Sequence, residues 1–100
     1  MDIITKLDST RDRTLPFFKL SDDKLERTYS PGKWSVRILL HHITDTETVL
    51  FDRVRRVLSE PGQVQWAFNQ DAWATGLGYS ELPLELSRDL YAAVRASVIY

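Results

Sequence analysis

The chain has 100 residues and a mass of 11.6 kDa, which is the size of one small domain and excludes a multidomain enzyme. Thirteen Lys and Arg against fourteen Asp and Glu give a net charge of -1, which argues against nucleic acid or anionic lipid as a partner. With no cysteine, no apolar run near the roughly 20 residues of a membrane span and no signal-peptide pattern, we expect a cytoplasmic protein without membrane contact.

The first expected helix lies between Ile3 and Phe18, where apolar residues recur at helical spacing. Pro16 removes a backbone hydrogen bond and crowds the preceding turn, so we expect this helix to kink or end early there. Residues 21–23 then place capping side chains and negative charge before Lys24, enough for a short helical turn.

The second helix is the clearest element of the sequence. Ser35 is well placed as its N-cap, and the segment 59–62 contains the Pro and Gly that stop it after about 23 residues. We expect its apolar stripe to form the buried face. The stripe consists of Val36, Leu39, Leu40, Ile43, Leu50, Val54, Val57 and Leu58.

The stretch that follows has no helical or strand period but is rich in aromatic residues. Trp66, Phe68 and Trp73 could form the wall of a pocket above a helical bundle, or a small separate core that pins a long loop. Asn69 or Asp71 could cap a short turn that positions Trp73. The sequence leaves both interpretations open.

A third helix is expected to start near Ser80, with Pro83 tolerated in its first turn. It shows no stop pattern before Tyr100, so we expect residues 1–100 to be a single domain that is incomplete at its C-terminus. The fold class is then all-α, an up-down helical bundle with three long helices and a fourth that is missing or supplied by a partner in a homodimer. The expected buried residues of the third helix are Leu84, Leu90, Tyr91, Val94 and Val98.

The two histidines lie side by side on the second helix, and successive side chains on a helix point about 100° apart. They therefore cannot both bind one metal ion. If the direction of Val36 around the helix axis is set to zero, His41 points at about 140°, beside Asp45 on the polar face. His42 points at about 240°. We take His42 as the inward metal-ligand candidate; the alternative is a half-buried histidine that donates a hydrogen bond to a carbonyl.

Glu47 falls at about 20°, in the middle of the apolar stripe, where a carboxylate needs a partner or a raised pKa. It could form a hydrogen bond near a metal site or between helices, bend toward solvent, or meet an Arg from another helix. The sequence contains no phosphate loop, zinc-protease motif or nucleophile motif, so these residues alone do not specify an enzyme.

The segment 31–45 resembles the DinB/YfiT-like superfamily of four-helix-bundle metalloenzymes. Its signature is P-G-x-W-[ST] with a His eight positions after the Trp, often as a His-His pair followed by Asp, and His42 is the matching position. The segment 69–73 resembles the acidic-x-Trp loop of that family, and Tyr79 resembles the tyrosine before its third helix.

The resemblance implies that His42 is one of three ligands to a divalent transition metal, zinc or nickel. The other two come from an H-x-x-x-H motif on a later helix of the family, and this chain, with two histidines, has no such motif. The metal site is then incomplete in this chain, and the metal could be absent from it. Six further residues are expected to form the pocket or the hydrogen bonds around the site: Trp34, Asp45, Glu47, Trp66, Asp71 and Trp73.

Two functions follow as hypotheses. The first is part of a DinB-like metal-dependent enzyme, a thiol-dependent transferase or a hydrolase, which acts on a small-molecule or thiol substrate. The second is a non-catalytic helical bundle that dimerises through its unfinished apolar face or binds a small ligand.

Overall fold

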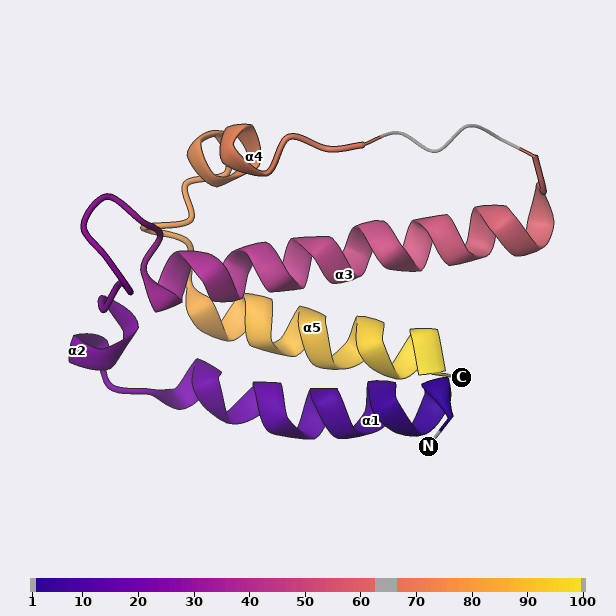
Figure 1. Ribbon diagram of the computed structural model, residues 1–100, viewed down its shortest axis with the longest axis horizontal. Helices are drawn as coiled ribbons and strands as arrows, with labels where there is room; N and C mark the ends of the chain where they lie inside the picture. The colour runs from indigo at the N-terminus through magenta and orange to yellow at the C-terminus, as the bar shows by residue number, and fades with distance from the viewer. Residues whose placement is uncertain (1, 63–66, 100) are drawn as a thin grey trace.

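The computed structural model describes residues 2–62 and 67–99, and all regular secondary structure in these residues is helical (Figure 1). This confirms the predicted all-α class and the helical bundle. The helices are α1 (Ile3–Thr14), the 3-10 helix η1 (Leu15–Lys19), α2 (Asp22–Leu25), α3 (Val36–Ser59), α4 (Gln70–Gly76) and α5 (Leu84–Ile99).

The first helix and α3 follow the predicted start and stop residues, whereas α4 lies in the stretch where no helical period was expected and α5 begins later than predicted. The first helix changes to a 3-10 helix at Leu15, one residue before Pro16, as expected. The Ser35 hydroxyl accepts a hydrogen bond of 3.2 Å from the Ile38 amide and caps α3. The expected start of the last helix near Ser80 is wrong, because residues 78–82 form tight turns and α5 begins after Pro83.

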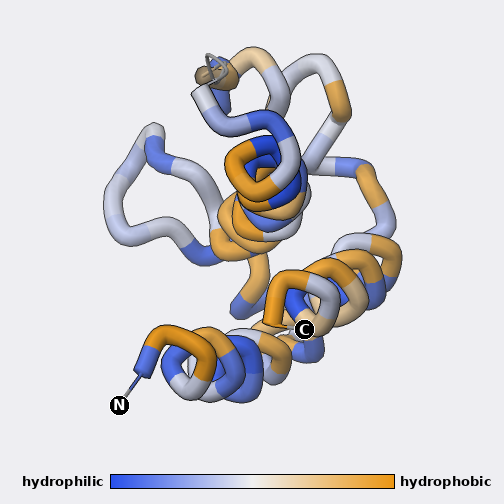
Figure 2. Tube along the Cα trace, turned by 90° about the vertical axis from the view of Figure 1, so that its right-hand side faces the viewer, coloured by the Kyte–Doolittle hydropathy of each residue, from blue (hydrophilic) through white to orange (hydrophobic). Residues whose placement is uncertain are grey.

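The three long helices occupy three corners of a bundle when viewed end-on (Figure 2). α5 packs against both α3 and α1. α3 and α5 run in the same direction, and α1 runs in the opposite one, because the connection after α3 returns along its length and carries α4 (Figure 1). This long return brings α4 over the first half of α3.

The apolar core is small and lies where η1, α2, α3 and α5 meet. It consists of Phe18, Leu25, Leu40, Leu84 and Tyr91. The expectation that Leu90 is buried is wrong, since 45% of it is exposed. The buried face of α5 instead carries Leu84, Ser87, Tyr91 and Arg95, at spacings of three and four that belong to one side of a helix.

The buried face of α3 is also turned away from its apolar stripe. The buried residues of this helix are Leu40, His41, Thr44 and Glu47. Leu39, Leu50 and Val57, which the stripe predicted to be inside, are 46%, 37% and 58% exposed. The buried face is rotated by roughly 80° from the centre of the stripe. The prediction failed because α5 presents polar side chains that pair with the polar residues of α3.

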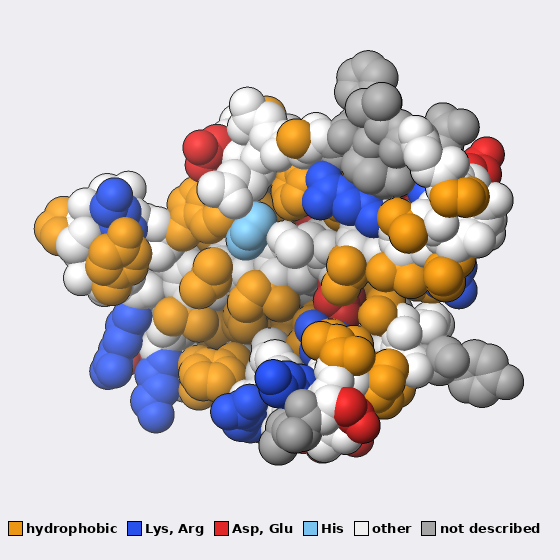
Figure 3. Space-filling view, turned by 45° about the vertical axis from the view of Figure 1, so that its right-hand side comes forward, with side chains coloured by type: hydrophobic (Ala, Val, Ile, Leu, Met, Phe, Trp, Pro, Cys, Tyr) orange, Lys and Arg blue, Asp and Glu red, His pale blue; other side chains and the backbone are white. Residues whose placement is uncertain are grey.

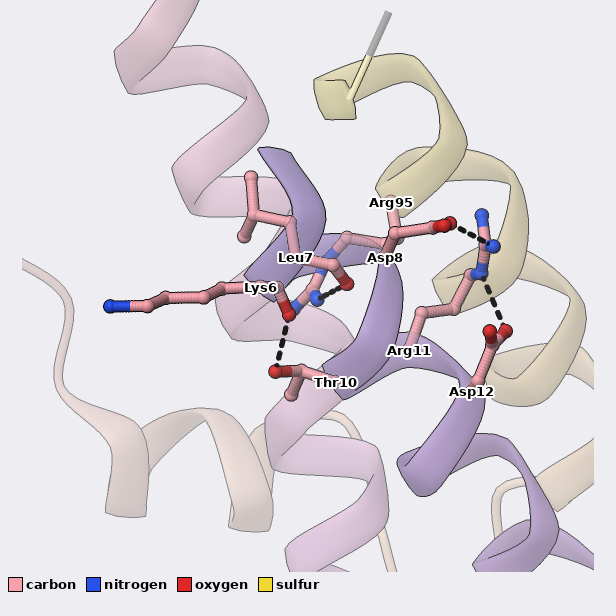
Figure 4. A network of polar contacts seen from close by, with 7 residues as sticks. All are labelled: Lys6, Leu7, Asp8, Thr10, Arg11, Asp12 and Arg95. Carbon is pink, nitrogen blue, oxygen red and sulfur yellow. Dashed lines mark hydrogen bonds and ion pairs between the residues drawn. The ribbon is translucent and has the colours of Figure 1, made fainter. Parts of the chain in front are cut away.

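A buried ion pair ties three helices together. Arg95 of α5 forms a bidentate ion pair with Glu47 of α3, in which Nη2 donates to Oε1 at 3.1 Å and Nε donates to Oε2. The Nη1 atom of Arg95 donates to the Leu7 carbonyl of α1 at 2.8 Å (Figure 4). Glu47 therefore meets an Arg from another helix, which was one of its predicted alternatives.

Removal of the Glu47 carboxylate should strongly destabilise the fold. Glu47→Ala leaves the Arg95 charge buried without its partner, so we expect the free energy of unfolding to fall by about 3–5 kcal/mol. Urea unfolding followed by circular dichroism measures this. Glu47→Leu combined with Arg95→Met removes both charges and should cost less than Glu47→Ala; a double variant as unstable as the single one would contradict this role for the pair.

Candidate metal and ligand site around His42

His42 lies in a row of aromatic rings on the side of α3 that faces α4. Its ring centroid is 5.1 Å from that of Trp34 and 6.2 Å from that of Phe68. Phe68 in turn packs on Trp73 of α4, with 4.7 Å between the centroids. We call Trp34, His42, Phe68 and Trp73 the aromatic cluster. It surrounds a half-buried imidazole with apolar surface.

One imidazole nitrogen of His42 has no hydrogen-bond partner among the described residues, and the other has only a weak one. Nδ1 is buried and has no hydrogen-bond partner among the described residues. Nε2 lies 3.5 Å from the Thr46 hydroxyl oxygen, a distance at which a hydrogen bond is weak. A buried nitrogen without a partner carries a desolvation cost that a bound metal or hydrogen-bonding ligand would remove. The ring thus fits the role of a ligand.

Two side-chain hydrogen bonds order α4 and the loop after it, and the second of them reaches α3. The Asn69 side chain accepts a hydrogen bond of 3.0 Å from the Ala72 amide and caps α4, which confirms the first of the two predicted caps. Tyr79 is buried and donates its hydroxyl hydrogen to Asp45. Burial and this hydrogen bond raise the pKa of Tyr79, so the phenol stays protonated as a donor.

The structure brings together some of the predicted site residues and separates others. Trp34 and Trp73 belong to the aromatic cluster with His42. Asp45 is engaged by Tyr79, and the Glu47 carboxylate by Arg95 between the helices. These two carboxylates therefore stabilise the fold around the site through their contacts with Tyr79 and Arg95.

The two remaining predicted residues belong to the return connection. Asp71 is exposed in the first turn of α4 and lines a cavity together with Trp34. Trp66 lies outside the described residues. The pocket-wall and loop-pinning interpretations of the aromatic stretch are compatible here, because Phe68 and Trp73 pack against each other and also border a cavity beside α3.

The expectation that His41 lies on the polar surface is wrong. His41 has no exposed surface, and its Nδ1 atom lies 2.6 Å from the hydroxyl oxygen of Ser87 on α5. Thr44, three residues later, donates to the Ser87 carbonyl at 3.0 Å. The predicted directions around the helix axis correctly separated the two histidines. They placed the buried side of α3 wrongly because only apolar residues were counted as buried.

Ser87 and Arg95 are important residues that the sequence interpretation did not single out. Both interrupt an apolar series on α5 at positions that share one helical face with Leu84 and Tyr91. The sequence pattern that could have revealed them is a polar residue at a core position of a helix. Such a residue indicates that the facing helix also buries polar groups.

His42 does not have enough partners here to complete a metal centre. Over residues 2–62 and 67–99, no group of three or more His, Asp or Glu side chains could hold a metal ion. The described part of this chain therefore contributes at most one histidine ligand to the type of site that the resemblance implies.

Comparison with known proteins identifies the family of this chain. The sequence profile of the DinB superfamily matches residues 6–100. The chain belongs to the DinB superfamily.

Two similar bacterial proteins carry the name "Putative metal-dependent hydrolase". One, from Oceanobacillus iheyensis, is 30% identical over 80% of this chain and 46% of its own length. The other, from Halalkalibacterium halodurans, is 31% identical over 81% of this chain and 47% of its own length. The chain thus spans about half the length of these relatives. No solved structure matches it significantly.

No helix in the described part of the chain has the length and apolarity to span a membrane.

The buried His41 predicts a loss of stability in mild acid. Burial lowers the pKa of His41 below its ordinary value of 6.5, so below that pH the unfolded chain binds more protons than the folded one. We expect the free energy of unfolding to fall as the pH drops below about 6.5, by at most about 1.4 kcal/mol per pH unit from this residue.

Urea unfolding at several pH values between about 7.5 and about 5.5 measures this dependence. His41→Asn retains a polar side chain without a titratable imidazole and should show a shallower pH dependence. An unchanged dependence in His41→Asn would assign the acid sensitivity to other groups.

Proposed function

We propose that this chain is part of a metal-dependent hydrolase in which His42 is a metal ligand. The observation that carries the proposal is the buried, unpaired Nδ1 atom of His42 within the aromatic cluster. Membership of the DinB superfamily and the names of the relatives support the metal-dependent class. The remaining ligands are proposed to come from segments outside the described residues or from a second subunit.

The described residues have clear tasks in this proposal. The rings of Trp34 and Phe68 lie against the half-buried His42 ring and restrict its rotation. The Tyr79–Asp45 hydrogen bond anchors the connection that carries α4. A divalent ion such as zinc or nickel suits an imidazole ligand, and when bound it supplies a Lewis acid that activates water or a thiol. Water as nucleophile gives a hydrolase, and a thiol gives the transferase alternative.

Zinc binding by this chain should depend on His42. We expect added Zn²⁺ to shift the side-chain nitrogen resonances of His42 in a long-range ¹H–¹⁵N NMR spectrum, since direct coordination changes the imidazole electronically. His42→Ala should lower the zinc affinity at least about tenfold.

The control is Glu85→Gln, which removes an exposed charge on α5 and should leave the affinity within about twofold. If Zn²⁺ shifts other residues while the His42 nitrogens stay unchanged, the proposed ligand role fails. Equal zinc affinities of His42→Ala and the unaltered protein would have the same meaning.

A second candidate function, self-association, is favoured by the apolar surface of α3. Leu39, Leu50 and Val57 lie on one side of this helix and are each more than a third exposed. Figure 3 shows hydrophobic side chains gathered across one face of the molecule, with a histidine side chain among them. We propose that a second copy of the chain covers this surface, because exposed apolar stripes of this kind commonly mark interfaces.

Self-association predicts a dimer that weakens when a charge enters the stripe. Analytical ultracentrifugation should show a monomer–dimer equilibrium, and Leu50→Lys should raise its Kd at least about tenfold because a lysine would be desolvated in the interface. Thr75→Lys, which adds the same charge to the exposed side of α4, is the control. A monomer at all concentrations would refute a homodimer formed by this chain.

A further inference from the structure

A cavity of about 400 Å³ opens between the turn before α3 and the start of α4. Its lining residues are Tyr29, Gly32, Lys33, Trp34, Leu39, Gln70 and Asp71. The volume lies within the range of natural small-molecule sites. It adjoins the aromatic cluster through Trp34, whose ring also contacts His42.

The apolar part of this cavity exposes side chains that the fold leaves uncovered. Tyr29 is 83% exposed and Leu39 is 46% exposed, while Trp34 is half-buried. Tyrosine and tryptophan offer a large, rigid surface on which a flat or branched apolar group can pack at low entropic cost. Tyr29 and Trp34 therefore form one wall that fits the apolar body of a ligand.

The polar part of the cavity carries one charge of each sign. Lys33 comes from the turn before α3, and Asp71 comes from α4. Neither side chain forms an ion pair or hydrogen bond with the described residues, and Asn69 already caps α4 in place of Asp71. An ammonium and a carboxylate without partners in one cavity favour a ligand that carries the two complementary charges.

We propose that this cavity binds a small zwitterion with an apolar side chain, of the amino-acid type. The ligand carboxylate pairs with Lys33, its ammonium pairs with Asp71, and its side chain packs on Trp34 and Tyr29. This binding needs no metal at His42, so it goes beyond the proposed hydrolase function and stands or fails separately from it.

L-phenylalanine is a direct probe of the proposed site. We expect saturable binding in isothermal titration calorimetry at millimolar ligand, together with a shift of the Trp34 indole N–H resonance, which Trp34→Phe identifies by its disappearance. Phenethylamine lacks the carboxylate and 3-phenylpropionate lacks the ammonium, so each should bind about tenfold more weakly.

Matched variants separate the two charges. Lys33→Met and Asp71→Asn should each raise the Kd for L-phenylalanine about tenfold, whereas Lys6→Met and Glu85→Gln, which change exposed charges on α1 and α5, should leave it unchanged. Circular dichroism checks that all four variants fold, which is expected because these side chains are exposed.

Three results would overturn the proposal. These are no saturable binding of L-phenylalanine, equal binding of the compounds that carry only one charge, and equal affinities of Lys33→Met, Asp71→Asn and the unaltered protein. His42→Ala should retain binding. If zinc binding fails while L-phenylalanine binds, only the metal proposal is lost, and the reverse result removes only the zwitterion site.

Discussion

The polar contacts buried between α3 and α5 determine how the rest of the molecule is arranged. His41 and Thr44 meet the side chain and the carbonyl of Ser87, and one turn further Glu47 meets Arg95. Such groups are costly to bury alone and specific when paired. They therefore fix both the rotation of α3 and its position along α5, which apolar contacts alone would define less precisely. Arg95 extends the same network to α1 through the Leu7 carbonyl.

This rotation of α3 has consequences on both of its other sides. Because His41 points into the interface with α5, the next residue, His42, points toward the return connection and its aromatic rings. Because the polar residues occupy the buried face, Leu39, Leu50 and Val57 remain exposed. The candidate metal ligand and the proposed dimer surface are thus two results of one constraint.

The return connection between α3 and α5 contributes Phe68 and Trp73 to the aromatic cluster and Asp71 to the cavity beside Trp34. It passes back along α3, so α4 lies near the start of that helix and near the turn that carries Trp34 (Figure 1). The Tyr79–Asp45 hydrogen bond fixes the end of this connection, and the packing of Phe68 on Trp73 fixes its middle. A rigid scaffold with a loop of this kind is a common way to build a binding site, because the loop is free of the packing demands of the core.

The amino-acid sequence by itself determined that three long helices form, because capping, proline stops and 3.6-residue periodicity are local effects. Ser35 and Pro16 act as predicted. It also determined that His41 and His42 diverge, since that depends only on helix geometry. Only the tertiary structure decided which of them is buried between helices, that Glu47 pairs with Arg95, and that Lys33 and Asp71 share a cavity. Those facts depend on partners 38 to 48 residues away in the chain, and the physical reason is that a polar residue's environment is set by the group it meets rather than by its own helix.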